Sequence, residues 1–79
     1  MKKNIKLKKG DAVQFEYSDK YDRETGVGIV VKVEEDNFYR VVLIEQEKDD
    51  WYFTNYQASL PVNRLRPLNK KVEDYGLSI

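Results

Sequence analysis

The sequence predicts an all-β fold, a small five-stranded barrel formed by a single domain. Apolar side chains recur at every second position in several short segments, which is the period of a half-buried strand. Clusters of turn-forming residues separate these segments about every ten residues. The chain has 79 residues and contains no cysteine and no histidine. It therefore depends on apolar packing, or on a second copy of itself, because it offers neither a disulfide nor an ordinary zinc site.

The first two strands are predicted on either side of a polar loop. Every second residue from Val13 to Tyr17 is apolar, which predicts the first strand. The loop over residues 18–25 leads to a second strand that opens at Gly26 and is rich in β-branched residues. We expect Gly26 and Gly28 to permit a positive φ or a close backbone approach where the chain turns a corner of the barrel.

The middle of the chain predicts two more strands. A short acidic turn over residues 34–37 suits a hairpin and leads into a third strand over residues 38–44. Both faces of this third strand carry apolar residues, so we expect it to pack inside the barrel and to be partly covered outside. A second acidic loop is expected at residues 45–50, followed by an aromatic fourth strand over residues 51–56.

The predicted barrel closes near the C-terminal end. Residues 59–62 are extended, and Pro61 is expected at an edge or a strand end because proline has no N–H to donate. A tight turn over residues 63–65 precedes a closing strand over residues 66–68. Closure of the sheet removes free edges, which makes a small barrel of the SH3-like type the economical arrangement for so short a chain.

Three regions are therefore expected: a basic arm over residues 1–9, the barrel over residues 10–68, and a short polar tail over residues 69–79. The tail either packs on the barrel or is disordered. The formal net charge is zero, so the overall basic excess typical of nucleic-acid-binding domains is missing. No apolar run is long enough to span a membrane, and no secretory leader pattern is present. We expect a cytoplasmic protein.

The composition argues against an enzyme. General acid–base catalysis most often uses histidine, and the serine and threonine hydroxyls have no such base beside them. The acidic runs are expected to be solvated turns, and they lack the spacing of a calcium-binding loop. The sequence around Gly26 and Gly28 lacks the third glycine and the following helix of a nucleotide-binding fingerprint. No catalytic residue, metal ion or cofactor is predicted.

The aromatic residues exceed what a small core needs, and tyrosine and tryptophan are enriched at binding hot spots. Arg64 and Arg66 flank Leu65, and either grip a carboxylate or phosphate of a partner or pair with acidic loops of the same domain. The predicted partner-binding residues are Tyr17, Tyr21, Tyr39, Trp51, Tyr52, Tyr56, Arg64 and Arg66.

Three motifs together resemble a known family. Residues 10–13 read Gly-Asp-Ala-Val, residues 26–30 read Gly-Val-Gly-Ile-Val, and residues 60–68 read Leu-Pro-Val-Asn-Arg-Leu-Arg-Pro-Leu. Their order and spacing resemble the Tudor-like, SH3-like domain at the start of the CarD family. This domain type also occurs in the transcription-repair coupling factor, and a relative lies at the C-terminus of UvrD-type helicases. The resemblance implies a five-stranded barrel that docks on RNA polymerase by strand addition. The helical, DNA-engaging domain of CarD-like proteins has no counterpart after residue 68.

Three functions are compatible with the sequence. The first is a non-enzymatic module, monomer or homodimer, that docks on a partner protein through an edge strand and exposed aromatics, with the transcription machinery as one candidate. The second is nucleic-acid binding by contacts to phosphates and stacking on bases. Its basic residues are Lys2, Lys3, Lys6, Lys8 and Lys9, together with Arg64 and Arg66. A remote third is an oligomeric small-barrel reductase, although the Gln-Ile-Tyr type motif of type II plasmid dihydrofolate reductases is absent.

Overall fold

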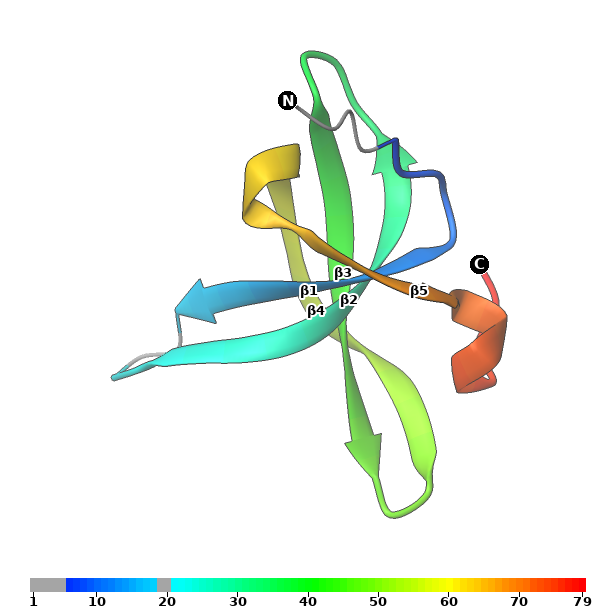
Figure 1. Cartoon of the computed structure of the whole chain (residues 1–79). Coiled ribbons are helices and arrows are strands. Elements are labelled where there is room, and N and C mark those ends of the chain that lie inside the picture. The colour runs from blue at the N-terminus through cyan, green and yellow to red at the C-terminus, as the bar shows by residue number, and fades with distance from the viewer. Residues whose placement is uncertain (1–5, 19–20) are drawn as a thin grey trace.

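The computed structural model describes residues 6–18 and 21–79, which form one sheet of five antiparallel strands in the order β4-β3-β2-β1-β5 (Figure 1). The strands are β1 (Asp11–Ser18), β2 (Arg23–Val33), β3 (Phe38–Glu47), β4 (Asp50–Pro61) and β5 (Arg66–Lys71). Two short 3-10 helices complete the chain, η1 (Val62–Arg64) between β4 and β5 and η2 (Val72–Tyr75) after β5. The predicted all-β class and the five strands of the small SH3-like barrel are confirmed. No helix in the described part of the chain is long and apolar enough to cross a membrane.

The sheet is strongly twisted. Figure 1 shows β1 and β5 running across the direction of β3 and β4, and the β3–β4 hairpin extending beyond the body of the barrel. The predicted acidic loop at residues 45–50 is wrong, because β3 continues to Glu47 and β4 begins at Asp50. Glu45 faces Tyr52 in this ladder, so the acidic residues belong to a paired hairpin and only two residues remain for the turn.

The β2–β3 hairpin forms at the short acidic turn that the sequence predicts. The N–H of Phe38 donates to the carbonyl of Glu35 at 3.2 Å. The two residues between them, Asp36 and Asn37, have φ values of 60° and 64°. This pair of left-handed residues is the pattern of a type I′ turn, whose twist matches that of the flanking strands.

Gly26 and Gly28 lie inside β2, because that strand begins at Arg23 and not at Gly26. Neither glycine has a positive φ. Both are needed for close approach: a Cβ added to Gly28 would lie 2.7 Å from Cε1 of Phe15, and one added to Gly26 would lie 2.9 Å from Cε1 of Tyr17. The two glycines therefore leave room on β2 for aromatic rings that project from β1.

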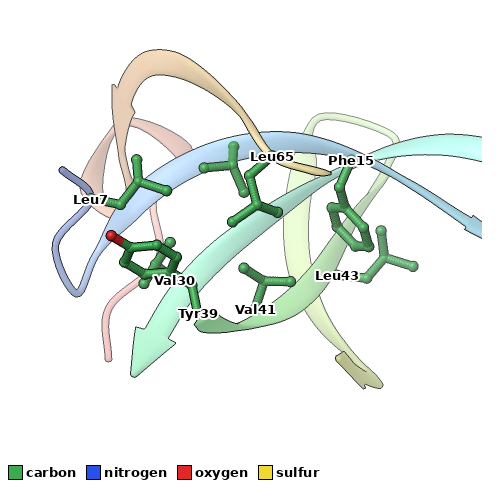
Figure 2. Packing of buried hydrophobic residues seen from close by; sticks show 8 residues of the cluster. Leu7, Phe15, Val30, Tyr39, Val41, Leu43 and Leu65 are labelled. Carbon is green, nitrogen blue, oxygen red and sulfur yellow. The ribbon is translucent and has the colours of Figure 1, made fainter. Parts of the chain in front are cut away.

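The main core cluster lies on the inner face of the sheet (Figure 2). Its buried members are Leu7, Val13, Phe15, Val30, Tyr39, Val41, Leu43 and Leu65. Leu7 comes from the expected basic arm and is 7% exposed, so this part of the arm is held by the core. Tyr39, one of the predicted partner-binding residues, is 6% exposed inside the cluster, because the alternation of β3 turns it inward with Val41.

A second cluster covers the opposite face of the sheet. Its buried members are Ala12, Ile29, Ile44 and Val72. Because β3 contributes to both clusters, the expectation that it is covered on both faces is confirmed. Trp51 packs edge-on against Tyr75, with ring centroids 4.9 Å apart. The C-terminal segment thus packs on the barrel, and β5 runs without a break across the expected boundary between residues 68 and 69.

Candidate protein-binding groove

Strand β1 is paired along its whole length on one side and along only half of it on the other. Its ladder with β2 extends to the pair Ser18–Arg23, whereas its ladder with β5 ends at the pair Gln14–Arg66. Glu16 and Ser18 therefore have no ladder partner on the β5 side among the residues that the structure places. Free strand edges of this kind are templates for pairing with another chain.

Pro67 indicates which backbone groups face this gap. Proline has no N–H, so its pair with Val13 is not a hydrogen-bonded one, and the exchange of backbone hydrogen bonds falls at Gln14 and Arg66. Because backbone groups point alternately to the two sides of a strand, the N–H and C=O of Glu16 and Ser18 are directed toward the gap.

Helix η1 keeps the chain away from this half of β1. The N–H of Val62 donates to the carbonyl of Asn37 at 2.9 Å, and the N–H of Leu65 donates to the carbonyl of Val62 at 3.1 Å. Leu65 is buried in the main core cluster, and β5 begins only after it. The tight turn that the sequence predicts at residues 63–65 is present as a single turn of 3-10 helix over residues 62–64. This helix places Asn63 and Arg64 beside the gap.

An open groove of about 520 Å³ lies at this place. Its lining residues are Gln14, Phe15, Glu16, Thr25, Asn63, Arg64, Leu65 and Arg66. We call this the β1 groove. Gln14 and Arg66 face each other across β1 and β5, and Glu16 and Thr25 face each other across β1 and β2, so these four side chains share the outer face of the sheet.

The β1 groove contains two arginines that have no acidic partner among the described residues. Arg23 pairs with Glu16 at 3.5 Å, and Arg40 pairs with Glu34 at 3.1 Å. No carboxylate of the described residues forms an ion pair with Arg64 or Arg66, and both are exposed. The sequence left two alternatives for these arginines, and internal pairing is not found in this part of the chain.

Three rings in contact with one another, which we call the aromatic trio, reach this groove through Phe15. Tyr17 and Tyr56 lie with ring centroids 5.4 Å apart, and Phe15 lies 5.8 Å from Tyr17 and 6.4 Å from Tyr56. Phe15 also lines the β1 groove. Tyr56 is 38% exposed, so the trio has an accessible surface although Phe15 is buried. Phe15 therefore connects two predicted binding tyrosines to the groove that contains the two predicted binding arginines.

A bulge in β4 directs Tyr56 toward β1. Between the pairs Val42–Gln57 and Ile44–Phe53, β3 has one residue and β4 has three, Thr54, Asn55 and Tyr56. The Thr54 hydroxyl donates to the carbonyl of Leu43 at 2.8 Å and accepts from the N–H of Tyr56 at 3.1 Å. Bulges bend a strand and redirect its side chains. The sequence shows only a β-prone aromatic stretch here, so the bulge is not predictable from composition or alternation.

The remaining predicted aromatic contacts lie elsewhere. Tyr21 is 88% exposed in the β1–β2 connection. Trp51 is half-buried against Tyr75 in the second cluster. Tyr52 is exposed and donates its hydroxyl to Glu45 at 3.0 Å, and this hydrogen bond raises the pKa of Tyr52 above its ordinary value of 10.0. None of these three rings lines the β1 groove.

The described lysines of the basic arm do not line the groove that contains the two arginines. Lys2 and Lys3 lie outside the described residues, and Lys6, Lys8 and Lys9 are exposed. Lys6 lines a different groove, of about 490 Å³, which also includes Lys70 and Lys71 of β5. The sequence analysis does not single out Lys70 and Lys71, although two adjacent lysines after Arg64 and Arg66 indicate a basic surface.

Comparison with known protein families, with curated proteins and with solved structures finds no match for this chain. Within residues 6–18 and 21–79, no group of three or more carboxylate, cysteine or histidine side chains is arranged to hold a metal ion. In the described part of the chain, the β1 groove is thus the place where an open strand edge, two arginines without an ion pair and the Phe15 ring of the aromatic trio meet.

Proposed function

We propose that this protein is a non-enzymatic binding module that accepts an extended segment of a partner protein as an additional strand along β1. The observation that carries this proposal is the half-length ladder between β1 and β5, which leaves Glu16 and Ser18 with a ladder partner on one side only among the described residues. In strand addition, backbone hydrogen bonds contribute affinity, and contacts to alternate side chains contribute specificity.

The other free edges of the sheet are less suited to strand addition. Strand β4 ends one side of the sheet, but its bulge at Thr54–Tyr56 interrupts the regular row of backbone groups. Strand β5 ends the other side and carries Pro67, Lys70 and Lys71 on six residues. Proline and lysine are common devices against edge pairing. The open half of β1 carries no proline and no bulge in its ladder with β2.

The resemblance to the CarD-type domain makes RNA polymerase one candidate partner, which would place the protein in the cytoplasm. Strand addition itself is independent of that identity. It requires only that the partner presents an extended segment whose backbone groups are free.

The test uses an uncharged probe, a blocked heptapeptide in which valine and threonine alternate. On titration with the isotope-labelled protein, we expect the amide resonances of residues 15–18 to shift and their hydrogen exchange to slow. Glu16→Pro is expected to abolish these effects, because it removes the N–H that faces the gap. Glu16→Ala removes the same carboxylate and keeps the N–H, so it serves as the matched control and is expected to retain binding.

Circular dichroism and one-dimensional spectra of both variants establish that the barrel remains folded. If the peptide perturbs β4 or β5 and leaves residues 15–18 unaffected, or if Glu16→Pro and Glu16→Ala bind it equally, the proposal is wrong.

A further inference from the structure

We infer that the segment accepted along β1 is acidic, with carboxylates directed to Arg64 and Arg66 and with apolar side chains directed to the aromatic trio. This inference rests on the proposed strand addition and specifies the chemistry of the partner. It predicts a recognised pattern in which acidic and apolar residues alternate.

The arginines carry the first step. Four arginines occur in the chain, and the two that have a carboxylate partner, Arg23 and Arg40, lie outside the β1 groove. The two that line the groove, Arg64 and Arg66, have no ion pair among the described residues. A guanidinium group presents a planar fork of donors that matches a carboxylate bidentately. The groove thus offers two guanidinium groups that form no ion pair with the described residues.

The charge around the groove carries the second step. The stretch over residues 63–72 contains four cationic side chains and no acidic one. Seven of the fourteen acidic residues lie at the β2–β3 turn and along the β3–β4 hairpin. Asp22 and Glu24, at the β1–β2 hairpin, do not line the groove. Among the described residues, Glu16 is the only carboxylate that lines the groove, and it pairs with Arg23 at 3.5 Å. An incoming acidic segment therefore meets a positive edge, which favours both association rate and selectivity.

The alternation of a strand carries the third step. Successive side chains of an added strand point to opposite faces of the sheet. On the outer face they would meet Arg66, which shares that face with Gln14, and Arg64 beside it. On the inner face they would meet Phe15 and the rest of the aromatic trio. Alternate positions of the bound segment are therefore selected for negative charge and for apolar surface.

The test compares three blocked heptapeptides by fluorescence anisotropy. In the first peptide valine alternates with glutamate, and in the second valine alternates with glutamine. The third peptide has the same composition as the first, but its valines form one block and its glutamates another. We expect the first to bind about tenfold more tightly than the second at low ionic strength, with the advantage shrinking as sodium chloride is added. The block peptide is expected to bind more weakly than the alternating one.

Substitutions test whether the preference for the glutamate peptide arises from Arg64 and Arg66. The double variant Arg64→Gln with Arg66→Gln is expected to remove the advantage of the glutamate peptide and to leave binding of the glutamine peptide unchanged. The matched control, Lys32→Gln with Lys48→Gln, removes two exposed cations outside the groove and is expected to preserve the advantage.

The possible failures are distinguishable. If the glutamate and glutamine peptides bind equally and both shift the amides of residues 15–18, the acidic preference is wrong and strand addition stands. If no peptide shifts these amides, both proposals fail. If a single-stranded oligonucleotide displaces the glutamate peptide from Arg64 and Arg66 at lower concentration than the peptide itself binds, the groove is a nucleic-acid site and the inference is overturned.

Discussion

The ring of Tyr17 on β1 lies against the α-carbon of Gly26 on β2, at a place where the neighbouring strand has no side chain. A Cβ atom at Gly26 would lie 2.9 Å from Cε1 of Tyr17 and 2.6 Å from Cδ1 of Leu43. Such distances are too short for a real methyl group, so the ring position depends on the absence of a side chain. Because Tyr17 belongs to the aromatic trio, a glycine in the middle of β2 helps to shape the border of the β1 groove.

Alanine at either glycine of β2 is expected to destabilise the protein by about 1–3 kcal/mol through overpacking. Gly28→Ala should cost more than Gly26→Ala, because its Cβ would lie 2.7 Å from the buried ring of Phe15 and 3.3 Å from the carbonyl oxygen of Val42. Urea unfolding provides the measurement. At Gly76 the φ is +74° and nothing lies within 4 Å of an added Cβ. Gly76→Ala is therefore expected to lower the free energy of unfolding only by the cost of a left-handed backbone conformation, about 1 kcal/mol. Equal losses of stability in all three variants would contradict overpacking at Gly26 and Gly28.

Glu34, directly after β2, contacts side chains of β3 and β4 and makes the stability of the fold depend on pH. The hydrogen bond from the Ser59 hydroxyl, assisted by the Arg40 guanidinium, lowers the pKa of Glu34 below its ordinary value of 4.5. A carboxyl whose pKa is lower in the folded state contributes stability above its unfolded pKa, and that contribution is lost as the pH falls through the folded pKa. We therefore expect the melting temperature to fall as the solution is acidified below pH 4.5.

The variant Ser59→Ala tests this link. It removes the largest cause of the shift, so the pKa of Glu34 is expected to rise toward 4.5 and the acid dependence of the melting temperature to weaken. Carboxyl resonances followed by NMR during titration measure the pKa directly. Ser78→Ala, at an exposed serine of the C-terminal segment, is the control. An unchanged pKa of Glu34 in Ser59→Ala would show that the hydroxyl does not hold the carboxylate.

Trp51 and Tyr52 are neighbours in β4 with different roles. Trp51 packs on Tyr75 in the second cluster, so Trp51→Ala is expected to destabilise the protein by about 2–3 kcal/mol. Tyr52 is 43% exposed and makes one surface hydrogen bond to Glu45, so Tyr52→Ala is expected to cost less than about 1 kcal/mol.

Both variants are expected to bind a peptide along β1 with unchanged affinity, because neither ring lines the groove. Thermal melts followed by circular dichroism report stability, and the amide shifts of residues 15–18 report binding. A larger loss of stability in Tyr52→Ala than in Trp51→Ala would mean that the face assignment of β4 is reversed.

The C-terminal segment contributes to the stability of the barrel. Val72 is 5% exposed, and its N–H donates to the carbonyl of Gly10 at 2.8 Å. We expect Val72→Ala to cost about 1–3 kcal/mol through a cavity in the second cluster. The fluorescence of Trp51, the only tryptophan, reports unfolding in urea. Glu73→Ala, at the exposed neighbouring position, is expected to be near neutral, and comparable losses in both variants would count against a packing role for Val72.

The existence of the strands could be predicted from the sequence, whereas the residues at which they begin and end could not. The apolar alternation from Val13 to Tyr17 and along β3 predicts which side chains are buried, because the period of a strand is two. Residues 45–50 were expected as a loop because acidic residues are common in turns. Pairing across the β3–β4 hairpin, which places Glu45 opposite Tyr52, outweighs that local preference.

The residue types of the candidate site were predictable from the sequence, whereas the arrangement of these residues in space was not. Tyr17, Tyr56, Arg64 and Arg66 are suggested by residue type alone, whereas their proximity depends on the bulge in β4 and on the point at which β5 leaves β1. Both features arise from the register of long-range pairing, which no local pattern encodes. For Tyr39 the residue type was misleading, because tyrosine is common in binding sites but this side chain lies in the core.

Within the described residues, β1 and β4 approach each other through the rings of Tyr17, Phe15 and Tyr56 and share no ladder. This contact is consequently made by rings, whereas neighbouring strands in the order β4-β3-β2-β1-β5 are joined by backbone hydrogen bonds. Ring reorientation is fast and needs no cooperative unfolding, whereas separating two laddered strands does. A strand that adds along β1, as proposed, would therefore require the rings to adjust and no ladder of the sheet to open.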